Sequence, residues 1–499
     1  MKKTNSAFGY TTPESIGISS ENVLKFMDQL EKEGVYLHSF ALLKGEDIFA
    51  EGYRPPFDEN FLHRMYSVSK TFTSMAIGIL VGDGTISLSD KVVSFFPDYC
   101  HDNMHKYLEE TTIRDLLIMA TPFSVESYSS KMSAHLEKDW VYTFFHAPVN
   151  HPAGTVFRYD TAGTYMLCAV VERVTGKDFL TFLKERALLK TGFSPDSWCV
   201  NSPEGYAWGG SGVECTLTDL ARFARLVMNG GKWRGEQLLP YDYIKEAISR
   251  QIDNNQDGFP MHGHTFLGYG YQIWITPDNT YSFLGMGTQL AICMPDEDLL
   301  FVCTADTQGN GDAYGSVFRA LWQWIKEPFS EPLPENKEAL LKLEEKLENL
   351  TYPVVEGAKT SSYAPKVNDT KYVLCENPMG IKNITVNLSG DEGTLCWENE
   401  QGYKELKFGI GKTVRGVFPQ KGYCGKTVGS EADHLYDCLA SGAWTDDNKL
   451  VLKIDLIDDY FGNLCIHLGY KGDEIGVSMQ KHAEFFLDEY NGFAGGIAE

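Results

Sequence analysis

The sequence predicts a mixed α/β protein, in which one antiparallel sheet with flanking helices is followed by a separate β domain. Strand-like segments at residues 35–53 and 268–305 enclose a long helical block at about 67–228. After Pro353 the helical pattern gives way to short runs of alternating apolar and polar residues. This order predicts a sheet whose edges come from distant parts of the chain, with a mostly helical subdomain beside it.

The elements group into three consecutive parts. Residues 1–330 hold the sheet and the helical block. Residues 331–352 are charged and bounded by prolines, and they predict a linker helix docked by a leucine stripe. Residues 353–499 predict an antiparallel β domain of about eight strands, closed as a barrel or a sandwich.

Within the first part, each element has its own signal. The runs YLHSFALL and DIFAEGY, separated by KGE, predict a hairpin at residues 35–53. Apolar residues recur at i, i+3, i+4, i+7 and i+8 from Phe72 to Leu80 and are followed by Gly82 and Gly84, which predicts a helix and its end. Further helices are expected at TTIRDLLIMA, MLCAVVERVTG, LTDLARFARLVMNGG and YGSVFRALWQWI, and strands at GYGYQIWI, QLAICMP and DLLFVCTA.

Composition narrows the possible partners and the location. Asp and Glu number 68 against 44 Lys and Arg, a net charge of -24 that disfavours nucleic acid and anionic lipid surfaces. The longest apolar stretch, MAIGILVG, is far shorter than the roughly 18 residues of a membrane-spanning helix. The N-terminus has no apolar signal region, and eleven cysteines without paired C-x-x-C spacing fit a reducing compartment. We therefore expect a cytoplasmic protein of unknown oligomeric state.

The sharpest motif is Ser67-Val68-Ser69-Lys70 at the start of the predicted helix. Residues three apart lie on one helix face, so the Lys70 amine can reach the Ser67 hydroxyl. The positive end of the helix dipole favours the neutral amine of Lys70, and the free N–H of Ser67 can stabilise an oxyanion. The alternative is that Ser67 is a helix cap and Lys70 a solvated surface residue.

The flanking words resemble a known family. MYSVSKTFTSMAIGILVGDGTISLSDKVVSFF, from Met65, is similar to the nucleophile helix of serine β-lactamases and penicillin-binding-protein-like hydrolases, especially the class C β-lactamase and esterase branch. Further similar segments follow in family order: TTIRDLLIMA, PAGTVFRYDTAGTYMLCAVVERVTGKDF, GGSGVECTLTDLARFARLVMNGGKW and GYGYQIW. The resemblance covers about residues 15–326 and implies the β-lactamase/transpeptidase-like fold, with Ser67 and Lys70 as nucleophile and proton-transfer group.

The second family motif, Tyr-x-Asn, resembles Tyr159-Asp160-Thr161 here. The resemblance implies that Tyr159 shares a proton with Lys70 and Ser67. A phenol suits that role when a nearby cation lowers its pKa, and we expect Lys70 to do so. Thr161 replaces the usual Asn, so a substrate amide carbonyl would find a weaker anchor.

The third family motif carries a basic residue, whereas the corresponding stretch Phe283–Gln289 contains none. The resemblance still implies an oxyanion donor from the backbone, and we expect Gly287, Thr288 and Gln289 to line the site, to within a residue or two. The missing cation favours neutral esters or amides over substrates with a free carboxylate.

These observations predict a serine hydrolase that forms an acyl-enzyme on Ser67 and acts on a small-molecule or short-peptide substrate, with no cofactor. The alternatives are a catalytically impaired binding or sensor protein, and a true β-lactamase or D-amino-acid peptidase. His262 and His264 form an H-x-H without an identifiable third ligand, so no metal site is expected.

Overall fold

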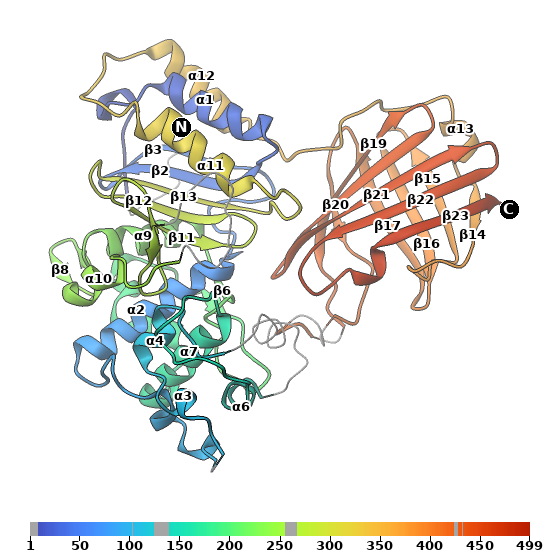
Figure 1. Cartoon of the computed structure of the whole chain (residues 1–499). Coiled ribbons are helices and arrows are strands. Elements are labelled where there is room, and N and C mark those ends of the chain that lie inside the picture. Colours follow the sequence, from blue (N-terminus) through green and yellow to red (C-terminus); the bar gives the residue numbers. More distant parts are fainter. Residues whose placement is uncertain (1–7, 102, 124–138, 255–266, 424–427, 432) are drawn as a thin grey trace. The chain divides into compact units, whose positions relative to one another are not determined.

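The protein was examined as a computed structural model, which describes residues 8–101, 103–123, 139–254, 267–423, 428–431 and 433–499. The chain forms two compact units, Met1–Thr351 and Tyr352–Glu499 (Figure 1). The first unit combines a sheet with helices, and the second consists almost wholly of strands. The predicted α/β class with a C-terminal β domain is confirmed.

The main sheet of the first unit has the strand order β1-β3-β2-β13-β12-β11-β10-β9. Strands β2 and β13 pair antiparallel, which joins the N-terminal hairpin to a strand from the end of the unit. Only β1 and β3 pair in parallel. The bounds are β1 Gly9–Tyr10, β2 Leu37–Lys44, β3 Asp47–Tyr53, β9 Gly268–Tyr269, β10 Trp274–Thr276, β11 Thr280–Gly285, β12 Gln289–Met294 and β13 Leu299–Ala305. Shorter strands outside it are β4 His63–Arg64, β5 Trp198–Cys199, β6 Val213–Cys215, β7 Lys232–Trp233 and β8 Glu236–Gln237.

Helices cover both faces of this sheet, as Figure 1 shows. Helices α1 (Ser20–Lys32), α11 (Ala313–Leu321) and α12 (Lys337–Glu348) contact one another on one side, and α9 (Leu217–Met228) packs against β12 and β13 on the other. Every residue of β12 and β13 is buried. A strand covered on both faces loses the alternation of apolar and polar residues, which explains the continuous apolar runs in the sequence.

Helix α2 (Ser69–Gly82) is the central element of the helical subdomain. Its residues from Ser69 to Leu80 are all buried, because α7, α8 and α10 surround it. A helix enclosed by other helices belongs to the core even though its first turns carry polar residues, so α2 is more deeply buried than its periodicity alone suggested. The other helices are α3 Lys106–Glu109, α4 Ile113–Leu117, α6 Trp140–Phe145, α7 Thr161–Thr175, α8 Phe179–Arg186 and α10 Tyr241–Ala247.

Helix α12 belongs to the first unit. Leu343, Leu347 and Leu350 lie in the same hydrophobic core as the sheet. Its Lys346 forms ion pairs with Asp28 (2.5 Å) and Glu31 (2.9 Å) of α1. The leucine stripe therefore docks the helix as the sequence predicts, and the compact unit continues to Thr351.

This placement predicts how the chain tolerates truncation. A chain ending at Thr351 should unfold cooperatively, whereas one ending at Lys326 should be strongly destabilised because it loses three buried leucines, each worth about 1.5–3 kcal/mol. Thermal unfolding followed by circular dichroism measures the difference. Equal melting temperatures for the two chains would show that α12 does not complete this core.

The second unit is a closed barrel. Nine strands pair in the order β17-β16-β15-β14-β23-β22-β21-β20-β19, and β19 pairs in parallel with β17 to close the ring, while β18 extends β19 outside it. The predicted count of about eight strands is thus low by two. The bounds are α13 Ala364–Val367, β14 Lys371–Leu374, β15 Asn383–Ser389, β16 Glu392–Asn399, β17 Gly402–Ile410, β18 Val414–Val417, β19 Asp437–Asp446, β20 Lys449–Ile457, β21 Phe461–Lys471, β22 Glu474–His482 and β23 Gly492–Ala498.

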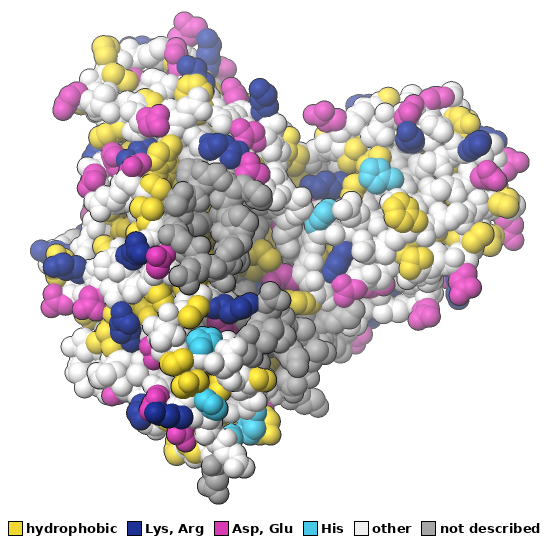
Figure 2. All heavy atoms as spheres, in the orientation of Figure 1, with side chains coloured by type: hydrophobic (Ala, Val, Ile, Leu, Met, Phe, Trp, Pro, Cys, Tyr) yellow, Lys and Arg dark blue, Asp and Glu magenta, His cyan; other side chains and the backbone are white. Residues whose placement is uncertain are grey.

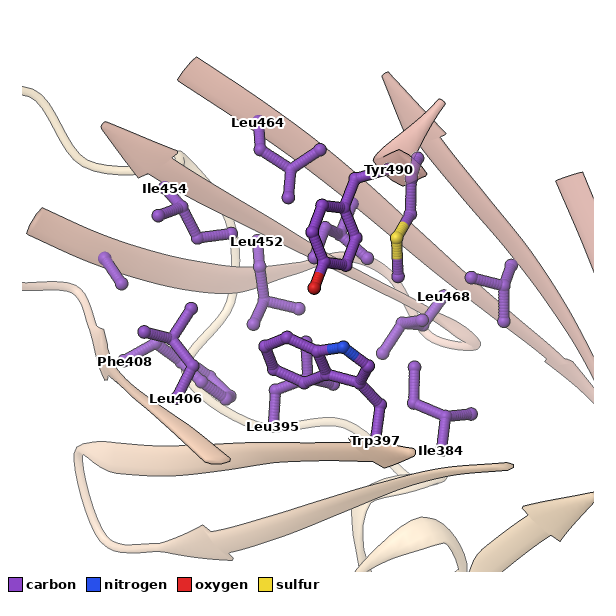
Figure 3. Packing of buried hydrophobic residues seen from close by; sticks show 14 of the residues in the cluster. Ile384, Leu395, Trp397, Leu406, Phe408, Leu452, Ile454, Leu464, Leu468 and Tyr490 are labelled. Atoms are coloured by element: carbon purple, nitrogen blue, oxygen red, sulfur yellow. The ribbon is translucent and has the colours of Figure 1, made fainter. Parts of the chain in front are cut away.

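Side chains fill the inside of this barrel (Figure 3). The inward positions of the alternating strands supply Leu395, Leu406 and Leu452, all essentially inaccessible to solvent. Trp397 and Tyr490 pack edge to face, with ring centroids 6.0 Å apart. Alternation along most of the strands therefore encodes a packed core, as expected for a barrel of this size.

Surface and thiol chemistry add few constraints. On the face seen in Figure 2, Lys and Arg side chains are interspersed with Asp and Glu and do not gather into one basic patch. Among the described residues, no helix is long and apolar enough to cross a membrane. The ten described cysteines are all free thiols.

Candidate active site

Ser67 and Lys70 lie where the predicted motif put them, at the entrance to α2. Ser67 belongs to a short 3-10 turn, Tyr66–Val68, that runs directly into α2. The Lys70 Nζ donates a hydrogen bond to Ser67 Oγ over 3.0 Å. Lys70 is almost fully buried while Ser67 is partly exposed. An accessible hydroxyl beside a buried amine is the arrangement that an activated nucleophile requires.

The Lys70 amine has a second acceptor. It donates to the Gly210 carbonyl over 2.6 Å, and this bond offsets part of the cost of burying the amine. Glycine is needed there because a Cβ at position 210 would lie 2.6 Å from Thr161 Cγ2. Thr161 therefore packs against the residue that holds Lys70 in place.

Tyr159 completes the group. The Lys70 Nζ lies 5.0 Å from the centre of the Tyr159 ring, and the Tyr159 hydroxyl forms a hydrogen bond with the Ser67 side chain. The ring stacks on Trp274, with centroids 5.5 Å apart. Asp160, which follows it, caps α7 by accepting from the Ala162 N–H and from the Thr121 hydroxyl. Asp160 thus has a structural role that fixes the backbone beside Tyr159.

The protonation of Tyr159 differs from the expectation. Burial raises the pKa of the Tyr159 phenol, and the hydrogen bond with Ser67 only partly opposes that rise. We expected Lys70 to lower this pKa, and that expectation is corrected: desolvation raises the pKa and outweighs the effect of the nearby amine. A raised pKa favours the protonated phenol, so Tyr159 is better suited to relay a proton than to rest as a phenolate.

The backbone before Ser67 is strained. Tyr66 has φ +45°, a conformation that bulky side chains rarely adopt. The buried Arg64 guanidinium lies over the Tyr66 ring at 4.9 Å and donates to the Ser211 carbonyl. Arg64 thus links the strained turn to the 208–211 loop that also supplies the Lys70 acceptor, which holds the nucleophile and the amine in register.

The third predicted segment forms the turn between β11 and β12. A Cβ at Gly285 would lie 2.3 Å from the Met65 carbonyl oxygen and 3.2 Å from the Val68 amide, so this turn begins against the backbone that carries Ser67. Met286 follows and is partly exposed. Gly285, two positions before the expected set, is therefore the residue of this turn that abuts the backbone around Ser67.

Gly287, Thr288 and Gln289 lie deeper. All three are buried. The Thr288 hydroxyl bonds that of Thr307 over 2.7 Å. The Gln289 amide donates to the Ala305 carbonyl over 2.7 Å and accepts from the Ala305 N–H. The structure brings Ser67, Lys70, Tyr159 and Thr161 together, and it turns the side chains of Thr288 and Gln289 into the sheet.

Sequence reasoning missed Gly210, Met286 and Tyr314. The Gly210 carbonyl accepts from Lys70 through the backbone, and Met286 follows the glycine that abuts the Ser67 backbone; residue types reveal neither feature. Tyr314 opens α11 and reaches the β11–β12 turn, where its hydroxyl donates to the Gly285 carbonyl over 2.6 Å. Its only sequence signal is a hydroxyl near the start of a mostly apolar helix.

No group of three potential metal ligands occurs among the described residues. His262 and His264, which prompted the question of a metal, lie outside the described residues. The turn of residues 285–289 carries no basic side chain.

Comparison with known proteins identifies the class. The Beta-lactamase family matches residues 22–321, so the chain belongs to this family of β-lactamase-fold serine hydrolases. The 6-aminohexanoate-dimer hydrolase of Paenarthrobacter ureafaciens is 25% identical over 264 residues, which span 50% of this chain and 67% of that enzyme. The beta-lactamase of Escherichia coli K12 is 23% identical over 269 residues, or 48% of this chain and 64% of that protein.

A solved structure shares the fold. The hydrolase EstCE1, described as having promiscuous acyltransferase activity, aligns with a TM-score of 0.50 at 14% identity, over 62% of this chain and 99% of its own. The matched family range holds Ser67, Lys70, Tyr159 and the β11–β12 turn, and the barrel of residues 352–499 lies beyond it. The expected family resemblance is confirmed.

Proposed function

We propose that the protein is a serine hydrolase that forms an acyl-enzyme on Ser67. The observation that carries the proposal is the convergence of Lys70 Nζ and the Tyr159 hydroxyl on Ser67 Oγ. The similar hydrolases support it, because each belongs to a class that cleaves an acyl bond or is described as transferring an acyl group. Ser67, Lys70 and Tyr159 together account for the two bond-forming steps of the reaction.

Ser67 Oγ attacks the substrate carbonyl while its proton passes to the neutral amine of Lys70, directly or through the Tyr159 hydroxyl. The carbonyl electron pair moves onto oxygen, and two backbone N–H groups stabilise that charge. We assign these donors to Ser67 and Met286. The intermediate collapses to the acyl-enzyme, and the leaving group takes the proton. Water, or another acceptor, then adds to the acyl carbon and releases Ser67.

Met286 is chosen because its turn abuts the Ser67 backbone and its N–H makes no hydrogen bond to another residue in the described part of the chain. A backbone N–H at a protein surface without a partner is available to an incoming oxyanion. The backbone N–H of Gln289 is a poorer choice, because Gln289 pairs with Gly285 in the sheet.

The preferred substrates are neutral esters or amides. The β11–β12 turn lacks the cation that would compensate a buried carboxylate, and desolvation of an unpaired carboxylate is costly. The net charge of -24 adds a smaller, salt-screened repulsion of anions. We therefore expect feeble activity on β-lactams that carry a free carboxylate.

A matched pair of substrates tests this. We expect kcat/KM for a methyl ester to exceed that for the same substrate with a free carboxylate at the recognised end by roughly tenfold or more, equivalent to about 1.4 kcal/mol. Met286→Lys keeps the backbone donor and should narrow the difference. Equal or higher kcat/KM for the carboxylate in the unmodified protein, at low and high salt, would contradict this preference.

The rival function is a binding or sensor protein that is acylated without turnover, which Thr161 in place of Asn favours. Pre-steady-state kinetics with a chromogenic ester separate the two. A stoichiometric burst followed by steady turnover supports the hydrolase, and a burst alone supports the sensor.

A further inference from the structure

Tyr314 is hydrogen-bonded to the β11–β12 turn. Its hydroxyl donates to the Gly285 carbonyl over 2.6 Å, and the Thr288 backbone amide lies beside the same oxygen. One phenol thus lies against the last residue of β11 and the residue that precedes β12. Phenylalanine has no hydroxyl to donate to Gly285, so it could not replace Tyr314.

The remaining carbonyl groups of the turn are held as well. Each accepts a hydrogen bond from a neighbouring strand or loop: Met286 O from Gln289 Nε2 (2.9 Å), Gly287 O from Thr307 N (3.3 Å) and Thr288 O from Cys303 Sγ (3.4 Å). The Met286 N–H makes no such bond within the described chain. The Gly287 N–H also makes no hydrogen bond there, but Gly287 is buried, so the partly exposed Met286 carries the accessible donor of the turn.

The turn needs to be held because it is strained. Gly287 and Thr288 both have φ +72°. Glycine adopts this conformation freely, but for a β-branched residue it costs on the order of 1–3 kcal/mol. The bond from the Tyr314 hydroxyl to the Gly285 carbonyl holds the β11 end of this strained turn. Loss of that bond would favour relaxation of the turn.

The clamp also lies close to the reacting groups. Gly285, its acceptor, abuts the Met65 carbonyl and the Val68 amide on either side of Ser67. Burial raises the pKa of Tyr314, so the hydroxyl keeps its proton and continues to donate to Gly285 at physiological pH.

We propose that Tyr314 is a positioning residue that clamps the β11–β12 turn and thereby aims the Met286 N–H at the oxyanion. This inference rests on the proposed function of the same site. It adds a residue from α11, far in sequence from the three motifs, whose hydroxyl acts on the transition state through the backbone. Tyr314 does not itself touch the substrate.

The test is Tyr314→Phe, with Tyr281→Phe as a matched control. Tyr281 is a buried tyrosine of β11 that pairs across the sheet with Cys293, away from the turn. We expect Tyr314→Phe to lower kcat for a neutral ester by about 10- to 100-fold, less than the 10²–10³ typical of deleting an oxyanion donor outright, with KM little changed. Tyr281→Phe should leave both constants near those of the unmodified protein.

A tetrahedral inhibitor distinguishes positioning from general destabilisation. A boronic acid that bonds to Ser67 mimics the oxyanion, so its affinity should fall by a factor similar to that of kcat in Tyr314→Phe. Unchanged kcat and unchanged boronate affinity in a protein that the ester does acylate would overturn the clamp alone. Absence of acylation in the unmodified protein would instead overturn the proposed function.

Discussion

Ser67→Ala should abolish covalent labelling by a fluorophosphonate and reduce ester hydrolysis by roughly 10⁴-fold or more, because no other group can form the acyl bond. Intact-mass spectrometry of the labelled protein measures the adduct, and peptide mapping locates it. The fold should persist, since the Ser67 side chain is partly exposed and loses only its bonds with Lys70 and Tyr159. Label on any other residue would contradict the assignment.

Ser69→Ala is the control at the neighbouring serine, and we expect it to lower stability rather than to abolish labelling. Ser69 is fully buried, and its hydroxyl accepts a hydrogen bond from the Val213 N–H over 3.0 Å. Removing that acceptor leaves a buried N–H unsatisfied and costs about 1–3 kcal/mol of stability. The variant should therefore melt at a lower temperature yet still be labelled on Ser67.

The sequence predicted local chemistry better than it predicted assembled geometry. The spacing of Ser67 and Lys70 determined that they meet, because three residues along a helical turn is a contact distance. Tyr159 lies on another element, and only the family resemblance placed it. The Gly210 carbonyl and the Met286 amide had no signal, and Tyr314 had only its hydroxyl, since backbone groups and tertiary hydrogen bonds are not written in residue types.

The same distinction applies to the barrel. Strands β15, β16 and β20 alternate clearly and were predicted, because each has one face in the core. Strand β19 is buried at seven consecutive positions and shows no period of two. In β23 exposure alternates, but its exposed positions include Phe493 and Ile497 and the strand is rich in glycine, so its sequence does not show the alternation. Closure of the ring through a parallel pairing of β17 with β19 joins two short segments, and no local pattern encodes it.

The largest remaining expected effect concerns the proton that Lys70 and Tyr159 share. Lys70→Ala and Tyr159→Phe should each lower the acylation rate by about 10²–10⁴-fold, as loss of a general acid–base group does. The double variant should be scarcely slower than the worse single one, because both groups serve one proton transfer to and from Ser67. Single-turnover kinetics on the folded fraction give the three rates.

Lys404→Ala is the matched control for the loss of a buried lysine side chain. Lys404 belongs to the barrel and is buried. Like Lys70, it donates a hydrogen bond to a backbone carbonyl, here that of Pro419 over 2.7 Å. Its loss should lower stability without changing acylation, which separates the chemical role of Lys70 from the cost of emptying a lysine site.

If the losses in Lys70→Ala and Tyr159→Phe multiply instead, the two groups act on different steps. Tyr159, kept neutral by burial, would then stabilise the departing group while Lys70 alone takes the Ser67 proton.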